Sequence, residues 1–166
     1  MSTNKQTKGQ RNQLTKQIGE YLVSAQLCRM DWISTTFTGN VPDFDIVALK
    51  DKETRRVQVK TIKSQGWQFN ARKFLKIDQR GNEQHVTGKI RFPDDEIIYV
   101  FVVLNGVNKD DYYICSIKDV QNMLYKSYKE NLKNKNNIRP RNPKSYHSAL
   151  NIDNLAPYKN AWDKFF

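Results

Sequence analysis

The sequence has no hydrophobic run of membrane-spanning length, and residues 1–16 contain no apolar segment of the kind found in secretory signal peptides. Its only cysteines, Cys28 and Cys115, and its only histidines, His85 and His147, are too widely spaced for a zinc site. We interpret both cysteines as reduced core residues of a cytoplasmic protein. A chain of 166 residues buries enough surface to fold without disulfides or a structural metal.

Acidic residues are also few relative to basic ones. The chain has 28 Lys and Arg against 17 Asp and Glu, which gives a formal net charge of +11. A charge of this size predicts an anionic partner, and nucleic acid is the first candidate. A membrane surface is the alternative, but every basic amphipathic segment has another explanation. We therefore expect a DNA partner and no membrane association.

Two short apolar segments within residues 41–63 contain polar residues that a core strand would exclude. Asp45 precedes the run IVAL, and Gln58 and Lys60 interrupt the second segment. Because side chains alternate along a strand, Gln58 and Lys60 project from the same face. These residues predict a polar site on an otherwise apolar hairpin.

The turn between the two segments predicts how they pair. Residues 51–54 are turn formers, which suits an antiparallel hairpin. If Leu49 pairs with Arg56, then Asp45 lies opposite Lys60, and directly opposed residues share a face. A carboxylate, an amide oxygen and an ammonium would then converge.

Residues 11–29 have the spacing of an amphipathic helix that packs on a sheet. Its apolar face is predicted from the residues that recur at helical spacing, which are Leu14, Ile18, Tyr21, Leu22, Ala25 and Cys28. Glu20 projects about 130° from the centre of this face, towards Val23 and Leu27. A single acid away from the apolar face is most simply a solvated glutamate.

Three further segments predict strands, so the expected fold class is α/β. Residues 32–37 and 112–117 have strand composition. The continuous apolar run at 97–104, IIYVFVVL, predicts a central strand buried on both faces. Ser116 is expected to cap a helix over residues 118–132.

No repeat or linker divides the chain, so residues 10–166 are expected to form a single domain. Residues 1–9 are small, polar and basic, and they predict a mobile arm. Residues 79–88 are polar and contain glycine, which predicts a loop. The aromatic residues within 150–166 predict a short terminal helix that docks on the core.

Hydrolysis of a phosphodiester needs a nucleophilic water, neutralised phosphate charge and a stabilised leaving oxygen, and a divalent cation supplies much of all three. Mg²⁺ prefers oxygen ligands, so one or two carboxylates plus a carbonyl-type oxygen suffice. Asp45 and the side-chain oxygen of Gln58 meet this description. Lys60 would place positive charge beside the scissile phosphate or orient the attacking water. Glu20, from the neighbouring helix, could bind a second ion or a metal-bound water.

Four motifs occur in the order that such a site requires. They are Gly19-Glu20, Gly39-Asn40, Pro42-Asp43-Phe44-Asp45 and Val57-Gln58-Val59-Lys60-Thr61. Together they resemble the PD-(D/E)XK nuclease superfamily, and within it the small single-domain members such as Holliday junction resolvases and intron-encoded homing endonucleases. The resemblance implies a restriction-endonuclease-like α-β-β-β-α-β core, with a central mixed sheet flanked by helices. It also implies Mg²⁺-dependent cleavage of nucleic acid, usually DNA.

The resemblance also implies a role for each catalytic residue. Glu20 is the helix acid, Asp45 is a metal ligand, and Gln58 and Lys60 form the (D/E)XK pair. Glu20, Asp45 and Gln58 would then bind Mg²⁺, for which Mn²⁺ would substitute. Lys60 would serve the transition state.

One residue departs from the family pattern. Gln58 stands where the family has Asp or Glu, and an amide offers an oxygen ligand without negative charge. Metal affinity should therefore be weaker unless Glu20 or a neighbouring acid compensates. Asp43 and Thr61 are possible supporting residues around the metal ligands.

Cations and aromatic residues alternate within residues 67–76, as on a surface where rings stack on bases and cations meet phosphates. The alternative is that Trp67 and Phe69 belong to a strand core. Residues 126–144 contain seven Lys or Arg and one acid, which predicts either a nucleic-acid contact or a solvated loop. The expected DNA contacts are Lys63, Trp67, Arg72, Lys73, Lys76, Lys133, Lys135, Arg139, Arg141 and Lys144.

The leading hypothesis is a Mg²⁺-dependent DNA endonuclease, either site-specific and of the homing type or structure-specific. The alternatives are a catalytically silent DNA-binding module of the same fold and, less favoured, a ribonuclease or RNA-binding protein. Because each active site of this kind cuts one strand, we expect a homodimer or a higher homo-oligomer. No small-molecule cofactor is expected.

Overall fold

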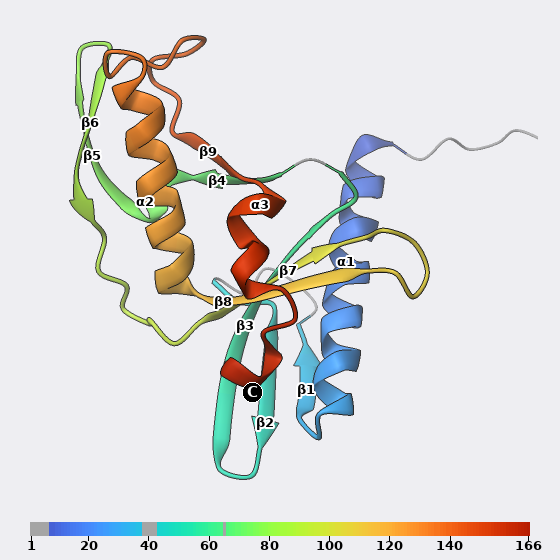
Figure 1. The fold of residues 1–166 in the computed structure, drawn as a ribbon. Coiled ribbons are helices and arrows are strands. Elements are labelled where there is room, and N and C mark those ends of the chain that lie inside the picture. Colours follow the sequence, from blue (N-terminus) through green and yellow to red (C-terminus); the bar gives the residue numbers. More distant parts are fainter. Residues whose placement is uncertain (1–6, 38–42, 65) are drawn as a thin grey trace, which may run out of the picture. The chain divides into compact units, whose positions relative to one another are not determined.

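Five strands form the central sheet, in the spatial order β1-β2-β3-β7-β8 (Figure 1). The computed structural model describes residues 7–37, 43–64 and 66–166. The strands are β1 (Ile33–Thr36), β2 (Ile46–Lys50), β3 (Glu53–Ile62), β7 (Ile98–Val103) and β8 (Asp111–Ser116). β1, β2 and β3 pair antiparallel, whereas β3 and β7 pair parallel, so the sheet is mixed.

The chain forms two compact units. Of the residues that the structure describes, one unit contains 7–37, 43–64, 96–115 and 158–166, and the other contains 66–95 and 116–157. The central sheet and the helix α1 (Lys8–Arg29) belong to the first unit. The single domain expected over residues 10–166 stays a prediction. Of the mobile arm predicted at its N-terminal side, residues 1–6 lie outside the described residues, whereas Lys8 and Gly9 already belong to α1.

The strands predicted around β1, β7 and β8 are confirmed to within one residue at each end. Every residue of β7 is buried, as expected of a central strand with both faces covered. The predicted class, α/β with a central mixed sheet flanked by helices, is confirmed. Among the helices that the structure describes, none is long and apolar enough to cross a membrane.

The predicted α-β-β-β-α-β order holds through β3 and differs after it. As far as the structure describes it, the connection from β3 to β7 contains no α-helix; α2 (Ile117–Lys133) follows β8 instead. The connection carries β4 (Trp67–Asn70), the 3₁₀ turn η1 (Ala71–Lys73), β5 (Leu75–Arg80) and β6 (Glu83–Lys89). Two parallel strands need a long crossover connection, and here an excursion built from strands provides it.

The hairpin of β2 and β3 has a different register from the one predicted. Leu49 pairs with Thr54 rather than Arg56, because the turn is only Asp51 and Lys52, with Asp51 at a φ of 54°. A shift of two residues leaves each side chain on its predicted face, since faces alternate with a period of two. It moves Asp45, however, from opposite Lys60 to beside Gln58.

Helix α1 packs on the sheet through a different face from the one predicted. Its buried residues are Gly19, Val23 and Leu27. Three residues of the predicted apolar face remain largely exposed, namely Leu14 at 42%, Ile18 at 41% and Tyr21 at 56%. The side of the helix that carries Glu20 therefore faces the sheet.

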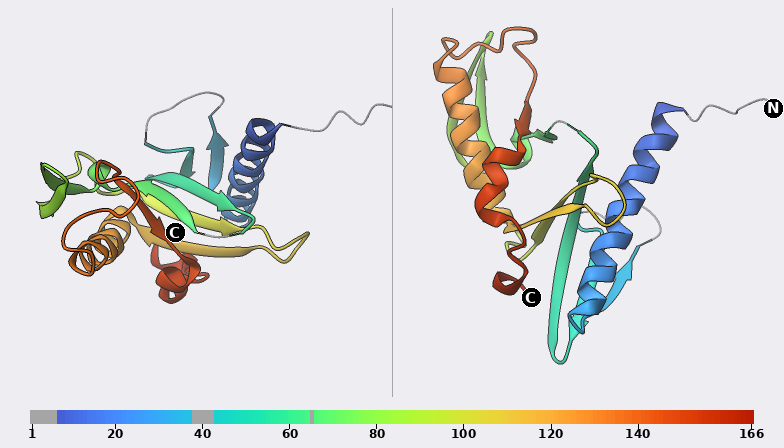
Figure 2. Two further views of the ribbon diagram at one scale, coloured as in Figure 1. Left: turned by 90° about the horizontal axis from the view of Figure 1, so that it is seen from above. Right: turned by 45° about the vertical axis from the view of Figure 1, so that its right-hand side comes forward.

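A close approach of helix and strand explains this choice of face. A Cβ atom on Gly19 would lie 1.8 Å from Thr61 Oγ1 and 2.8 Å from Thr61 Cβ, so only glycine fits there. With α1 held against β3 at this point, Val23 and Leu27 enter the core beside Val57 and Val59. Figure 2 shows α1 running beside β1 and β3.

The C-terminal aromatic residues pack against the same core. Trp162, Phe165 and Phe166 all contact it, and the rings of Trp32 and Phe166 meet edge to face with centroids 5.6 Å apart. The predicted docking is thus confirmed. The terminal elements are α3 (Ile152–Leu155) and the 3₁₀ turns η2 (Ala156–Tyr158) and η3 (Trp162–Lys164).

In the second unit, α2 runs beside the hairpin of β5 and β6, and β4 pairs with β9 (His147–Leu150) (Figures 1 and 2). Ser116 caps α2 as predicted, in a capping box with Asp119. The loop predicted at residues 79–88 is wrong, because β5 and β6 pair there as an antiparallel hairpin. Gly81, with a φ of 59°, makes its turn, and a solvated hairpin tolerates polar side chains.

Candidate active site

The site begins at Asp45, where β2 starts beside β3. The backbone N–H of Asp45 donates to Val57 O at 2.8 Å, which holds the residue at the strand end. Its Oδ2 accepts the backbone N–H of Val59 at 2.9 Å and the side-chain Nε2 of Gln58. The other carboxylate oxygen, Oδ1, faces helix α1. Rotation of the Gln58 amide by half a turn would present Oε1 in place of Nε2.

Lys16 joins two carboxylates across the gap between helix and sheet. Its Nζ lies 3.3 Å from Glu20 Oε1 and 3.2 Å from Asp45 Oδ1. The side chains of Glu20 and Asp45 are only 12% and 11% exposed, whereas that of Lys16 is 57% exposed. Two nearly buried acids therefore share one cation that reaches in from solvent.

The charges of this group act on one another. Burial raises the pKa of Glu20 above its ordinary value; the Lys16 ammonium opposes this shift, and the Asp45 carboxylate adds to it. Burial lowers the pKa of Lys16, but the charges and hydrogen bonds of Asp45 and Glu20 outweigh it, so the pKa of Lys16 is raised. The raised pKa of Lys16 indicates a site that favours positive charge between the acids.

The structure brings three of the four predicted catalytic residues together, namely Glu20, Asp45 and Gln58. Lys60 lies two residues beyond Gln58 on the same face of β3, half-buried and opposite Phe101 of β7. The solvated glutamate considered for Glu20 is wrong, because the helix face that carries it turns towards the sheet.

The two predicted supporting residues lie in different surroundings. Asp43 is exposed, with a φ of 75°. Thr61 projects from the face of β3 opposite to Gln58 and contacts Gly19. Its influence on the site is indirect, because this contact sets the position of the neighbouring Glu20. The motif residues Gly39, Asn40 and Pro42 lie outside the described residues.

Sequence reasoning missed two residues of this site. Lys16 was detectable from its position four residues before Glu20, where helical side chains meet. Tyr99 pairs with Gln58 across β3 and β7 and is buried. Burial, together with the negative charges of Asp43 and Asp45, raises the pKa of Tyr99, so its hydroxyl stays protonated near the acids. The signal available in the sequence was the one tyrosine in the apolar run at 97–104.

The donor set suits a hard cation with few protein ligands. Within residues 7–37, 43–64 and 66–166, no three His, Cys, Asp or Glu side chains are grouped to hold a metal ion. The site instead offers two carboxylates and one amide. The Lys16 ammonium shows that one cation can contact both carboxylates at once, and Mg²⁺ accepts such a set because it retains several waters.

The predicted DNA contacts fall into a buried and an exposed group. Trp67 is only 3% exposed and pairs with Leu150, so its prediction as a DNA contact is wrong and its interpretation as strand core is confirmed. Phe69 is buried as well. The exposed cations of the set are Lys63, Arg72, Lys73, Lys76, Lys133, Lys135, Arg141 and Lys144, while Arg139 is half-buried.

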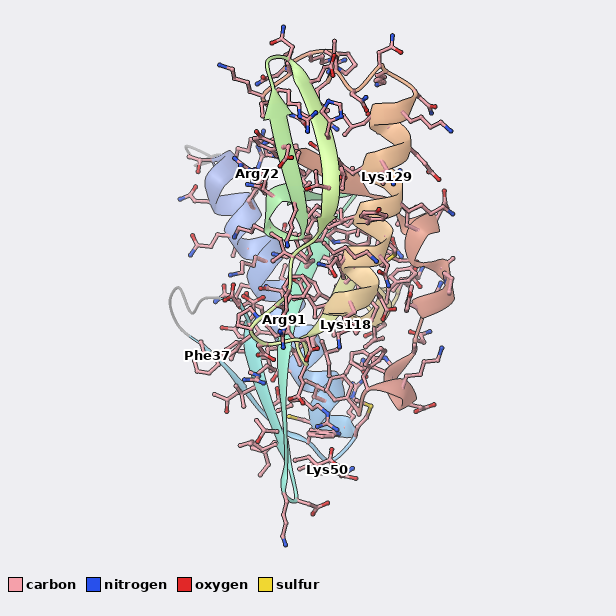
Figure 3. The ribbon with its side chains drawn as sticks, turned by 90° about the vertical axis from the view of Figure 1, so that its left-hand side faces the viewer. Phe37, Lys50, Arg72, Arg91, Lys118 and Lys129 are labelled. Carbon is pink, nitrogen blue, oxygen red and sulfur yellow. The ribbon has the colours of Figure 1, made fainter. Side chains whose placement is uncertain are left out.

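Several of these cations are held by aromatic rings of the second unit. Arg72 lies over the ring of Tyr146 at 4.6 Å, and Arg139 lies over Tyr128 at 5.2 Å. Arg72, and Lys129 on α2, project outward in Figure 3. A cavity of about 490 Å³ is lined by Lys135, Arg139 and Arg141 together with Asn131, Pro140, Asn142 and Ser145.

The segment that carries this cavity is anchored by a buried glutamine. Gln84 is fully buried; it accepts the hydroxyl of Tyr128 at 2.5 Å and donates to Pro143 O at 2.5 Å. It also donates to Ser145 O at 3.2 Å. The basic segment is therefore hydrogen-bonded to the second unit over several residues.

Comparison with known proteins identifies a solved structure with a similar fold. No protein-family model matches this sequence, and no curated protein does. A solved structure of a bacterial homing endonuclease, I-Ssp6803I, matches with a TM-score of 0.50 at 14% sequence identity. The match covers 92% of this chain and 90% of that chain. At the level of the fold, this chain is therefore similar to a homing endonuclease.

Proposed function

We propose that this protein is a metal-dependent DNA endonuclease of the PD-(D/E)XK superfamily that acts on DNA in the cytoplasm. The observation that carries the proposal is the arrangement around Asp45, whose Oδ1 shares the Lys16 ammonium with Glu20 and whose Oδ2 is contacted by Gln58. The fold shared with a homing endonuclease and the net charge of +11 support it. The three motifs that supply the proposed ligands lie on α1, just before β2 and on β3, and these elements adjoin one another.

In this proposal Glu20 and Asp45 supply carboxylate oxygens, and Gln58 supplies Oε1 after rotation of its amide. A Mg²⁺ or Mn²⁺ ion bound there supplies Lewis-acid polarisation of the phosphate and activation of the attacking water. Lys60 stabilises the negative charge that develops on the phosphate or orients the water. The backbone N–H of Val59, which donates to Asp45 Oδ2, fixes the direction in which Oδ1 points.

Exposed cations of the second unit supply the contacts to phosphates. Lys135, Arg139 and Arg141 line one cavity and present their charges together. Because Arg139 is held by Tyr128 and donates to His147 O at 2.6 Å, its guanidinium is positioned before DNA arrives. Preorganised contacts of this kind lose less conformational entropy on binding.

We also propose that the protein works as a homo-oligomer, since cutting both strands needs two sites. The exposed apolar side chains of α1 support this, because such a face is typical of a protein interface. Ile18 borders a groove of about 730 Å³ that Leu22, Leu104 and Val107 also line. Light scattering at several concentrations measures the assembly, and a strict monomer with and without DNA would refute it.

Cleavage assays test the proposed function. Supercoiled, linear and branched DNA, and RNA of matched sequence, are incubated with the protein and either Mg²⁺, Mn²⁺ or EDTA. We expect DNA cleavage that depends on the metal and is lost in Asp45→Ala and Lys60→Ala but retained in Lys8→Met, a charge change outside the site. Full activity of Lys60→Ala, or cleavage that EDTA does not stop, would contradict the proposal.

A catalytically silent DNA-binding module is the second candidate, and the uncharged Gln58 is the observation that favours it. Calorimetry separates the two. A silent module would bind DNA with a steep salt dependence but would show no Mn²⁺ binding that depends on Asp45. A ribonuclease is distinguished in the cleavage assay by its preference for the RNA substrate.

A further inference from the structure

Lys16 contacts one oxygen of each of the two carboxylates that the proposed function assigns to a metal ion. Its ammonium is within 3.3 Å of Glu20 Oε1 and 3.2 Å of Asp45 Oδ1. An ordinary pair between residues four apart on a helix would engage only Glu20. The second contact, to a residue on another element, places the ammonium between two carboxylates, which is where a cation that neutralises both must lie.

The two carboxylate oxygens of Asp45 have different partners. Oδ2 is already the acceptor for the N–H of Val59 and for the Gln58 side chain. Oδ1 is therefore the oxygen that faces Glu20, and it is the one that Lys16 contacts. A divalent ion that bridges Glu20 and Oδ1 of Asp45 must share this oxygen with the ammonium or replace it.

Burial identifies which member of the group can move. The carboxylates are 12% and 11% exposed, so withdrawing either into solvent would require the helix or strand to move. Lys16 is 57% exposed and has a flexible stem with four rotatable bonds, so its ammonium can leave for water when another cation neutralises the two carboxylates. The cation, not the acids, is the exchangeable partner.

We propose that Lys16 is a resident cation: it occupies the metal position in the metal-free protein, holds the two acids together, and is displaced when a divalent ion binds. This inference rests on the proposed function. Lys16 thus stabilises the site without metal and competes with metal for it. The competition raises the concentration of divalent cation at which the site fills.

The test measures binding and stability rather than cleavage. Mn²⁺ is titrated calorimetrically into the full-length wild type, Lys16→Met, Lys16→Arg and the control Lys8→Met, which removes a charge from the same helix away from the site. We expect Lys16→Met to bind Mn²⁺ about tenfold more tightly than the wild type, because two weak ion pairs no longer compete. Lys16→Arg, which keeps the charge, and Lys8→Met should bind like the wild type.

Thermal melting provides the second measurement. In EDTA, Lys16→Met should melt roughly 2–4 °C below Lys8→Met, because two nearly buried carboxylates lose their shared cation. With saturating Mn²⁺ the difference should vanish or reverse, since the metal now neutralises the acids in both proteins. This comparison of melting temperatures with and without Mn²⁺ needs no DNA and no catalytic turnover.

The outcomes separate the inference from the proposed function. If the wild type binds Mn²⁺ through Asp45 but Lys16→Met binds it no more tightly, the metal site stands and the inference about Lys16 is overturned. Equal melting of Lys16→Met and Lys8→Met in EDTA overturns it as well. If no variant binds Mn²⁺ in a manner that depends on Asp45, both the inference and the proposed metal site fail.

Discussion

Replacing Gly19 with alanine should destabilise the protein, although the same change usually stabilises a helix. Alanine is favoured over glycine within a helix by about 1 kcal/mol. Here the added Cβ would lie 1.8 Å from Thr61 Oγ1, 2.8 Å from Thr61 Cβ and 2.9 Å from Thr61 Cγ2. A turn of the threonine side chain moves Oγ1 and Cγ2 but not Cβ, so α1 must shift from β3.

Overpacking of a tight contact costs about 1–3 kcal/mol, and subtracting the helix gain of about 1 kcal/mol leaves a net loss of up to about 2 kcal/mol. For a chain of this length that corresponds to a Tm lower by up to about 4–8 °C. Because Glu20 follows Gly19, the shift should also weaken Mn²⁺ binding measured by calorimetry. Urea unfolding followed by circular dichroism gives the free energy of unfolding directly.

Gly9→Ala is the matched control, because its Cβ would have only Thr7 Oγ1 nearby, at 3.9 Å. We expect this variant to be as stable as the wild type or slightly more stable. Thr61→Ala removes two of the three clashing atoms, so Gly19→Ala should cost less in that background. The reasoning is refuted if Gly19→Ala is as stable as Gly9→Ala, or if its cost is unchanged when Thr61 is alanine.

Three other changes test different parts of the structure. Tyr128→Phe should lower the free energy of unfolding by about 1–3 kcal/mol, because buried Gln84 loses its donor. Burial raises the pKa of Tyr128 above 10, so the folded state holds this proton more tightly, and the advantage of the wild type over the variant should shrink as pH rises above 10. Gln58→Glu should tighten Mn²⁺ binding and lower the Tm measured in EDTA, because a third carboxylate then lies beside Asp45; unchanged calorimetric affinity would show that Gln58 is no ligand. Arg141→Ala should weaken DNA binding and reduce the slope of log affinity against log salt by about one, with Lys52→Ala at the hairpin turn as the control; an unchanged slope would remove Arg141 from the interface.

Local sequence patterns were sufficient to predict those features that depend only on neighbouring residues or on uniform surroundings. The run at 97–104 is apolar throughout, so it predicts a buried strand whatever lies on either side, and β7 is buried at every residue. Ser116 begins a capping box with Asp119 only three residues away, so the start of α2 is a local property. Gln58 and Lys60 share a face because strand geometry alternates side chains, and even the register error preserved that relation.

Features that depend on contacts between distant segments were not available from local patterns. The apolar periodicity of α1 favoured the face with Leu14 and Ile18, but a single close contact between Gly19 and Thr61 outweighed it. That contact carries Glu20 and Lys16 to Asp45, which is 25 residues or more away along the chain. Residue types and spacing thus specify which polar groups the hairpin presents. The packing of α1 on β3 completes the site. The energy of such a contact depends on how well the two surfaces complement each other in shape, and hydrophobic periodicity carries no information about shape.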